Sequence, residues 1–322
     1  FPADYGAHPD YRTEWWYLTG WLGQGPSAIG FQLTFFRSRT QHAIENPSRL
    51  APQQLLFAHA ALAVAKQDIF LHANRAGRLS GTTLRAENTD TNLQFEDWHL
   101  RRMQRAETDV YEGRFAGEGF AVSFEASTQQ PVILRGEAGL SKKGPQAKQA
   151  SYYYSRAPLH VNASVVLGKQ TQILEGKAWL DHEWSSQLLM SGAVGWDWVG
   201  INLLDGGTLM AFQIRDKKSE SLYTHVDARD RGGMPVSGWG GLKWQPRGSW
   251  RSKSLIDYPI HMDLVVKGQT FRLVPLILSQ EVDARSSTGG FYWEGAVRLM
   301  KEEHLLGHGY LELTGYGAPL RI

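Results

Sequence analysis

Residues 159–167 (LHVNASVVL) decide the fold class, because apolar and polar side chains alternate along them. The apolar positions are Leu159, Val161, Ala163, Val165 and Leu167, and the polar positions between them are His160, Asn162 and Ser164. A period of two places the apolar side chains on one face of an extended chain, as in a β-strand with one buried face. The Gly168-Lys169 sequence that follows is typical of a hairpin turn.

The same alternation recurs along the chain and predicts an all-β protein. It is clear at residues 29–35 and at residues 258–266, where Lys267-Gly268 again indicates a turn. Further strands are expected at residues 15–22, 55–65, 121–126, 172–179, 196–204, 209–215, 291–300 and 305–313. Residues 55–65 also fit a helix, because alanine is a good helix former. No segment shows the pattern of a long amphipathic helix.

The composition narrows the function classes. The chain has 322 residues, enough for two domains. Its 34 basic and 32 acidic residues give a net charge of +2, which does not indicate a nucleic-acid-binding face. Cysteine is absent, which excludes disulfides, thiolate metal sites, iron–sulfur clusters and cysteine nucleophiles. No apolar run approaches the roughly 18 residues of a membrane helix, so any membrane contact is expected to be peripheral.

An internal repeat predicts two similar domains, each a closed barrel or a strongly curved sandwich. The repeat comprises Trp16, Gly25 and Phe31-Gln32-Leu33 in one copy, and Trp198, Gly207 and Phe212-Gln213-Ile214 in the other. The Trp-to-Gly spacing is nine residues in both copies, although chance matching of common β-residues is the alternative. Residues 141–150 (SKKGPQAKQA) are polar and contain Gly-Pro, as in a linker. We therefore expect domains at 1–140 and 151–322.

Two clusters of aromatic and acidic residues are the strongest candidates for chemistry. One is Glu14-Trp15-Trp16-Tyr17, and the other is Asp181-His182-Glu183-Trp184, followed by Trp196-Asp197-Trp198. A carboxyl group among indoles is poorly solvated, which raises its pKa and lets it donate a proton near neutral pH. A neighbouring histidine can relay that proton, and aromatic faces can stabilise a developing cation. The clusters predict acid catalysis on an apolar substrate, unless the acids only bond backbone, indole or arginine groups.

Other polar residues on predicted strands are weaker candidates. His59 lies in an apolar setting and is expected to be a hydrogen-bonded interior residue. Gln32 and Gln213 alternate with apolar neighbours, so they face either a barrel lumen or solvent. Glu294, near Tyr292, is expected to pair with Glu312 across two strands in a structural role.

No metal and no cofactor are expected. His304 and His308 have the spacing of two ligands on a helix, but Gly307 lies between them in a predicted strand-to-strand turn. The sequence also lacks a G-x-S-x-G elbow, an H-E-x-x-H motif, a Walker loop and a dinucleotide-binding glycine pattern.

Three ordered motifs carry a family resemblance that spans nearly the whole chain. Glu14-Trp15-Trp16-Tyr17 with Thr19-Gly20, Asp181-His182-Glu183-Trp184, and residues 309–316 (GYLELTGY) together resemble the carotenoid 1,2-hydratase-like family, also called CrtC-like or AttH-like. The resemblance implies two lipocalin-like β-domains with an apolar ligand cavity in or between them. Some relatives hydrate a terminal double bond of acyclic carotenoids without a cofactor, fungal relatives act as cyclases, and others accompany transport components.

The leading functional hypothesis is a cofactor-free hydratase or isomerase-type lyase acting on an isoprenoid, polyene or lipid. Asp181 or Glu183 would donate the proton, and His182 would be its partner or activate water. The expected ligand-contacting set is Glu14, Trp16, Tyr17, Gln32, His59, Trp184, Trp196, Asp197, Trp198, Gln213, Tyr292 and Glu294.

Two alternatives stay open. One is a non-catalytic carrier of a hydrophobic ligand in the cell envelope, working with a transporter. The other is a carbohydrate-binding β-protein with exposed indole platforms. Because the chain begins at Phe1 and relatives include exported members, we expect a periplasmic or secreted location, with the cytoplasm as the alternative.

Overall fold

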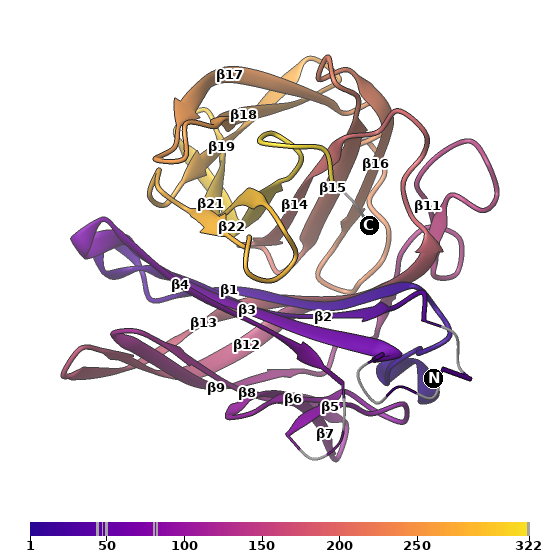
Figure 1. Cartoon of the computed structure of the whole chain (residues 1–322). Helices are drawn as coiled ribbons and strands as arrows, with labels where there is room; N and C mark the ends of the chain where they lie inside the picture. Colours follow the sequence, from indigo (N-terminus) through magenta and orange to yellow (C-terminus); the bar gives the residue numbers. More distant parts are fainter. Residues whose placement is uncertain (43–44, 47, 49–50, 80, 82, 321–322) are drawn as a thin grey trace.

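Strands dominate the computed structural model, which describes all residues except 43–44, 47, 49–50, 80, 82 and 321–322 (Figure 1). The described residues contain no α-helix and three short 3-10 turns: η1 (Ala3–Tyr5), η2 (Gly25–Ser27) and η3 (Ala65–Gln67). Among these residues, no helix is long and apolar enough to cross a membrane. The predicted all-β class is confirmed.

The first sheet contains thirteen strands and curls into a nearly closed barrel (Figure 1). Its strands are β1 (Thr13–Leu22), β2 (Ile29–Arg39), β3 (Gln54–Val64), β4 (Ile69–Arg78), β5 (Leu84–Ala86), β6 (Asn92–Phe95), β7 (Trp98–Arg105), β8 (Thr108–Gly117), β9 (Phe120–Thr128), β10 (Ile133–Leu134), β11 (Leu140–Lys142), β12 (Ala150–Leu167) and β13 (Gln170–Gln187). They pair in the order β4-β3-β2-β1-β13-β12-β9-β8-β7-β6-β5, with β10 and β11 beside β12.

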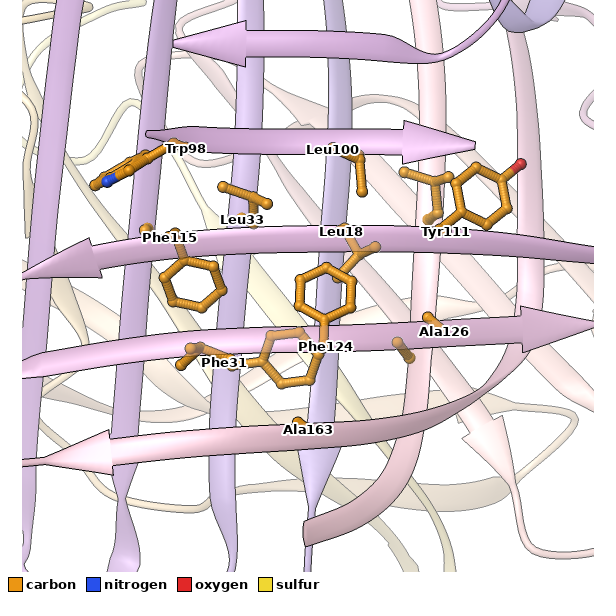
Figure 2. Packing of buried hydrophobic residues seen from close by; sticks show 14 of the residues in the cluster. Leu18, Phe31, Leu33, Trp98, Leu100, Tyr111, Phe115, Phe124, Ala126 and Ala163 are labelled. Carbon is orange, nitrogen blue, oxygen red and sulfur yellow. The ribbon is translucent and has the colours of Figure 1, made fainter. Parts of the chain in front are cut away.

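Two layers of this sheet cross over one another around an apolar core (Figure 2). Figure 2 shows Leu33, Phe31 and Leu18 meeting Phe115 and Phe124 between the layers. The expected hairpin at Gly168-Lys169 joins β12 to β13, whose long strands form the middle of the sheet. The ambiguous segment 55–65 is strand β3, because its alternate residues pack into this core.

The second sheet contains nine strands and forms a curled half-barrel over the β1–β4 layer (Figure 1). Its strands are β14 (Gly195–Leu203), β15 (Thr208–Arg215), β16 (Ser221–Arg229), β17 (Lys243–Arg251), β18 (Asp257–Val266), β19 (Gln269–Pro275), β20 (Glu281–Asp283), β21 (Phe291–Lys301) and β22 (His304–Leu313). They pair in the order β16-β15-β14-β22-β21-β19-β18-β17, with β20 beside β21.

The change of sheet falls between Gln187 and Gly195, not at the expected linker 141–150. Part of that segment belongs to β11, and the strands that follow it, β12 and β13, lie in the first sheet. The polar composition of 141–150 marks a connection between strands of one sheet. Polarity and Gly-Pro indicate an exposed connection, but they do not say which strands it joins.

The internal repeat corresponds to two hairpins, β1–β2 and β14–β15. Both hairpins present one face to the other sheet, and this shared boundary is filled by a third core that includes Tyr17, Trp179, Trp198 and Phe212. Gly30 lets the sheets approach, because a Cβ there would lie 2.5 Å from the Cβ of Ala296. Strands such as β1 therefore bury side chains on both faces.

Candidate functional site

A cavity of about 760 Å³ lies between the two sheets, within the usual size range of small-molecule sites. Aromatic rings from both sheets line it, including Trp15 and Tyr17 from β1, Trp196 and Trp198 from β14, Phe212 from β15 and Tyr292 from β21. The rings of Trp15 and Trp196 stack across the boundary, with centroids 6.5 Å apart. The polar side chains of Lys143, Asp181, Glu183 and Glu312 also line the cavity.

Asp181 on β13 is a buried carboxyl held by three donors. Its Oδ2 accepts from the Tyr153 hydroxyl at 2.5 Å, and its Oδ1 accepts from the Trp179 indole at 2.7 Å and from the Ser155 hydroxyl. The Trp198 indole donates in turn to the Tyr153 hydroxyl at 3.1 Å. Burial raises the pKa of Asp181 to about 6, even though these hydrogen bonds and a nearby arginine favour the charged form.

Glu183, two residues along β13, forms a buried ion pair. Its Oε1 lies 3.0 Å from Nζ of Lys143 and accepts from the Ser151 hydroxyl at 2.5 Å. The ammonium of Lys143 also lies over the rings of Phe212 and Tyr153, 4.2 and 4.8 Å from their centroids. No sequence pattern pointed to Lys143, because it falls in the segment expected to be a linker.

Glu312 on β22 is a third cavity carboxyl, which the sequence placed only in a structural pair. Its Oε2 accepts from the Trp196 indole at 2.8 Å. The pKa of Glu312 is raised to about 7, mainly by burial and partly by the charges of Glu183 and Asp181, whereas the hydrogen bond from Trp196 lowers it. The signal was available in GYLELTGY: Glu312 alternates with the apolar residues Leu311 and Leu313, so it lies on the opposite face of the strand.

Glu294 and Glu312 are direct cross-strand partners, as expected. The Glu294 side chain lies at the sheet boundary, where its Oε2 accepts from Nε2 of Gln32 on β2 at 2.7 Å. Burial raises the pKa of Glu294 well above its usual range, and the charge of Glu312 adds to the effect. Gln32 thus faces the second sheet rather than a barrel lumen or solvent. This hydrogen bond is a polar contact between the two sheets.

The side chains of His182 and Glu14 lie on the face of β13 and β1 opposite to Asp181 and Glu183, although Glu14 also contributes to the cavity lining. Oε1 of Glu14 accepts from Nε2 of His182 at 2.9 Å and from Nδ1 of His8 at 2.8 Å, and Oε2 accepts from Nε of Arg37 at 2.7 Å. Burial by itself would raise the pKa of Glu14, but these hydrogen-bonding partners outweigh burial and hold the pKa well below its usual range. Burial also lowers the pKa of His182, whose Nδ1 lies 3.1 Å from the Tyr154 hydroxyl.

Aromatic rings pack this network into the end of the first barrel. The ring of His182 stacks on fully buried Trp16 with centroids 4.4 Å apart, and His8 stacks on Trp184 at 3.7 Å. His8, Glu14 and His182 place three ligand-type atoms within 4.8 Å of one another. Those atoms already bond each other, and a guanidinium lies on the same carboxylate, so the donor set fits a closed hydrogen-bond network better than a cation site.

His59 on β3 links the first sheet to Tyr292 on β21 and to Ser287 in the loop before β21. Nδ1 of His59 lies 2.7 Å from the Tyr292 hydroxyl, and Nε2 lies 2.7 Å from the Ser287 hydroxyl. Burial lowers the pKa of His59 to about 3, so the ring is neutral at pH 7. His59 is the interior hydrogen-bonded histidine that its apolar setting indicated, and Tyr292 alone of this pair reaches the cavity.

Asp197 and Gln213 face the interior of the second sheet. Asp197 accepts from Nε2 of Gln213 at 2.7 Å, from Nε of Arg215 at 2.9 Å and from the Tyr316 hydroxyl at 3.1 Å. Burial raises the pKa of Asp197. The group lines a separate hollow of about 300 Å³.

The structure therefore divides the candidates chosen from sequence. It brings Tyr17, Asp181, Glu183, Trp196, Trp198 and Tyr292 to the central cavity, and Glu294 with Gln32 directly behind it. It places Glu14, Trp16, His182 and Trp184 in the barrel-end network. The structure does not bring Asp181, His182 and Glu183 into a single site. Successive side chains of a strand point to opposite faces, so His182 points away from the other two.

The fold and the site define a class of all-β proteins with two curled sheets and an aromatic cavity between them. The sequence profile of the AttH-like family matches residues 1–316, so the chain belongs to the AttH-like family. A solved protein from Nitrosomonas europaea assigned to AttH is 38% identical, with a TM-score of 0.88 over 98% of this chain and 96% of that chain. No curated protein matches the chain by sequence.

Two more distant structures share the fold. Kievitone hydratase from Nectria haematococca is 11% identical, with a TM-score of 0.72 over 98% of this chain and 92% of that chain. CghA solved with Sch210972 is 13% identical, with a TM-score of 0.60 over 96% of this chain and 89% of that chain. At these identities the likeness shows the fold alone.

Proposed function

We propose that the protein binds an elongated apolar small molecule in the central cavity and adds water across, or isomerises, one of its double bonds by acid catalysis. One observation carries the proposal: an aromatic cavity of about 760 Å³ contains two buried carboxyl groups, Asp181 and Glu312, whose pKa values are raised to about 6 and about 7. General acids work best when their pKa lies near the working pH.

Glu312 is the proton donor in this proposal. With a pKa raised to about 7, its carboxyl can hold a proton near neutral pH, and within the described part of the chain it accepts a hydrogen bond from the Trp196 indole. Transfer of that proton to one alkene carbon leaves a cation on the other carbon and a carboxylate on Glu312. Water then adds to the cation and returns a proton to the carboxylate, so the balance is one water added. Loss of a different proton would give the isomer.

Asp181 and the aromatic rings stabilise the cation in this scheme. With a pKa of about 6, Asp181 is mostly ionised at pH 7 and supplies negative charge to the cavity. The faces of Trp15, Trp196 and Trp198 supply the quadrupole that attracts a cation. Glu183 is bound to Lys143 and is assigned no proton transfer. His182 has no part, because it faces the barrel interior.

Two structurally similar proteins support this class of function. Kievitone hydratase is named for water addition, and CghA was solved with a small molecule, Sch210972. Binding of an apolar molecule without change is the rival function, since the same aromatic walls would serve a carrier. The discriminating observation is therefore chemical change in the ligand rather than binding.

The test combines a binding probe with a turnover assay in heavy water. All-trans-retinol reports occupancy through quenching of cavity tryptophans, and squalene, farnesol and lycopene serve as candidate substrates. After incubation in D2O, extraction and mass spectrometry should show a product that carries added deuterium. Glu312→Gln should bind retinol normally and lose about 10²–10⁴-fold in rate. If the wild-type protein binds retinol but changes none of the three compounds, the proposed reaction is wrong and the protein is a carrier.

A further inference from the structure

Arg135, which follows β10, contacts all three residues whose side chains hold the Asp181 carboxyl. Its backbone N–H donates to the carbonyl of Tyr153 at 3.0 Å, and its Nε donates to the Ser155 hydroxyl at 2.8 Å. Its guanidinium lies over the Trp179 ring, 5.0 Å from the centroid. Arg135 is completely buried, so no solvent screens its charge.

The other end of this guanidinium faces the second sheet. Its Nη1 lies 3.1 Å from Oδ2 of Asp227 on β16. Neither Nη1 nor Nη2 of Arg135 has a well-aligned hydrogen bond among the described residues. Asp227 is also bound by Nε and Nη2 of Arg229, at 2.7 and 3.0 Å. One buried positive charge thus lies between two carboxyl groups, one on each sheet.

We propose that Arg135 is a positioning residue that fixes the orientation and charge of Asp181 through Ser155 and Trp179. Asp227, on the second sheet, weakens the electrostatic effect of Arg135 on Asp181. The inference deepens the proposed function, because it concerns the same cavity carboxyl. It also explains why a buried arginine lies at the boundary between sheets. A buried guanidinium is costly unless its charge is compensated.

The electrostatics give the two partners opposite effects on Asp181. Burial raises the pKa of Asp181, and Arg135 is the largest influence that lowers it. Burial likewise raises the pKa of Asp227, but Arg229 and Arg135 outweigh burial and keep it low. Asp227 is therefore an anion that neutralises part of the Arg135 charge. Tyr153 and Glu312 also interact with Asp181, Lys143 is paired with Glu183 two residues along the strand, and the charges of Arg135 and Asp227 act on His225.

The test uses two variants that break the same ion pair. Arg135→Gln removes the positive charge and should move the titration midpoint of Asp181 up by about one pH unit. Asp227→Asn frees the positive charge from its partner and should move that midpoint down. The readout is carboxyl NMR of protein labelled with ¹³C-aspartate, without substrate, and Asp181→Asn identifies the signal. Arg135→Lys keeps the positive charge but loses the Nε hydrogen bond to Ser155. It should therefore move the titration midpoint of Asp181 up by less than Arg135→Gln does.

A purely structural ion pair predicts equal losses of stability and no opposite movement of the midpoint. Shifts of the same sign in Arg135→Gln and Asp227→Asn, or no shift in either, would overturn the proposal. If Arg135→Gln does not fold, the downward shift in Asp227→Asn still decides the sign. Because the titration needs no turnover, opposite shifts beside an inactive wild-type protein would refute the proposed reaction and leave this inference standing.

Discussion

The two faces of strand β13 differ in what they do with ionisable groups. On one face, Asp181 and Glu183 line an aromatic cavity between the sheets. On the other, His182 and Arg37 both hydrogen-bond to the Glu14 carboxylate in a network at the barrel end. Burial on the cavity face raises the pKa of Asp181 to about 6, whereas the partners on the barrel face hold Glu14 as an anion.

The difference shows that chemistry and stability can be adjacent in sequence and separate in space. Glu312, which has no cation partner among the residues that the structure describes, keeps a raised pKa and can exchange protons. A carboxyl that accepts from an arginine and two histidines, such as Glu14, is locked as an anion. Substitutions on the two faces should therefore affect different measurements.

The largest expected effect separates two neighbouring tryptophans. Trp16 is completely buried in the first core, so Trp16→Ala should lower the free energy of unfolding by about 3–5 kcal/mol. Trp15 faces the cavity, so Trp15→Ala should cost less stability and weaken retinol binding. Urea unfolding and fluorescence titration measure the two quantities. Equal stability losses would break the distinction between the faces.

The same substitution at two glutamates gives the next contrast. Glu14→Gln leaves the buried Arg37 without its anion and should lower the free energy of unfolding by about 3–5 kcal/mol at pH 7. Glu312→Gln should cost little or stabilise, because burial already favours its neutral form. Chemical denaturation of both variants under identical conditions is the check. A Glu312→Gln loss as large as that of Glu14→Gln would contradict the assigned roles.

His182→Ala should act on stability rather than on the cavity. It leaves the buried oxygens of Glu14 and Tyr154 short of a partner, which costs about 1–3 kcal/mol. Retinol affinity and any turnover should be retained under conditions where the variant stays folded. Loss of turnover in a fully folded His182→Ala protein would restore the catalytic role expected from the sequence.

The smallest effects are the pH dependences, which have opposite signs on the two faces. The pKa of Glu14 is lowered on folding, so its stabilisation is present above about pH 4.5 and is lost as pH falls below that value. The pKa of Glu312 is raised to about 7, so its ionisation costs stability as pH rises from about 4.5 to 7. At acid pH the free energy of unfolding of Glu14→Gln should therefore approach that of the wild-type protein. Glu312→Gln should become more stable relative to the wild-type protein as the pH rises towards neutral. Unfolding curves between pH 3 and 8 test both signs.

The sequence by itself determined many of the strands, although not β4 to β8, β16 or β17, together with several hairpins and the chemical character of the motifs. The alternation at 159–167 and 258–266 is a strong signal, because those strands have one clearly apolar face. The clusters around Glu14 and Asp181 were also found at the right places in the chain. Their residue types, buried acids among aromatic rings, are the ones that the structure brings into its two networks.

Only the tertiary structure decided which face each residue serves. Strand β1 buries both faces, so its sequence loses the alternation that would distinguish the barrel interior from the cavity. The partners of the key carboxyls come from distant segments: His182 lies 168 residues from Glu14. The roles of Glu312 and Arg135 depend on strand pairing and on the closure of the sheets. Local composition does not predict those contacts.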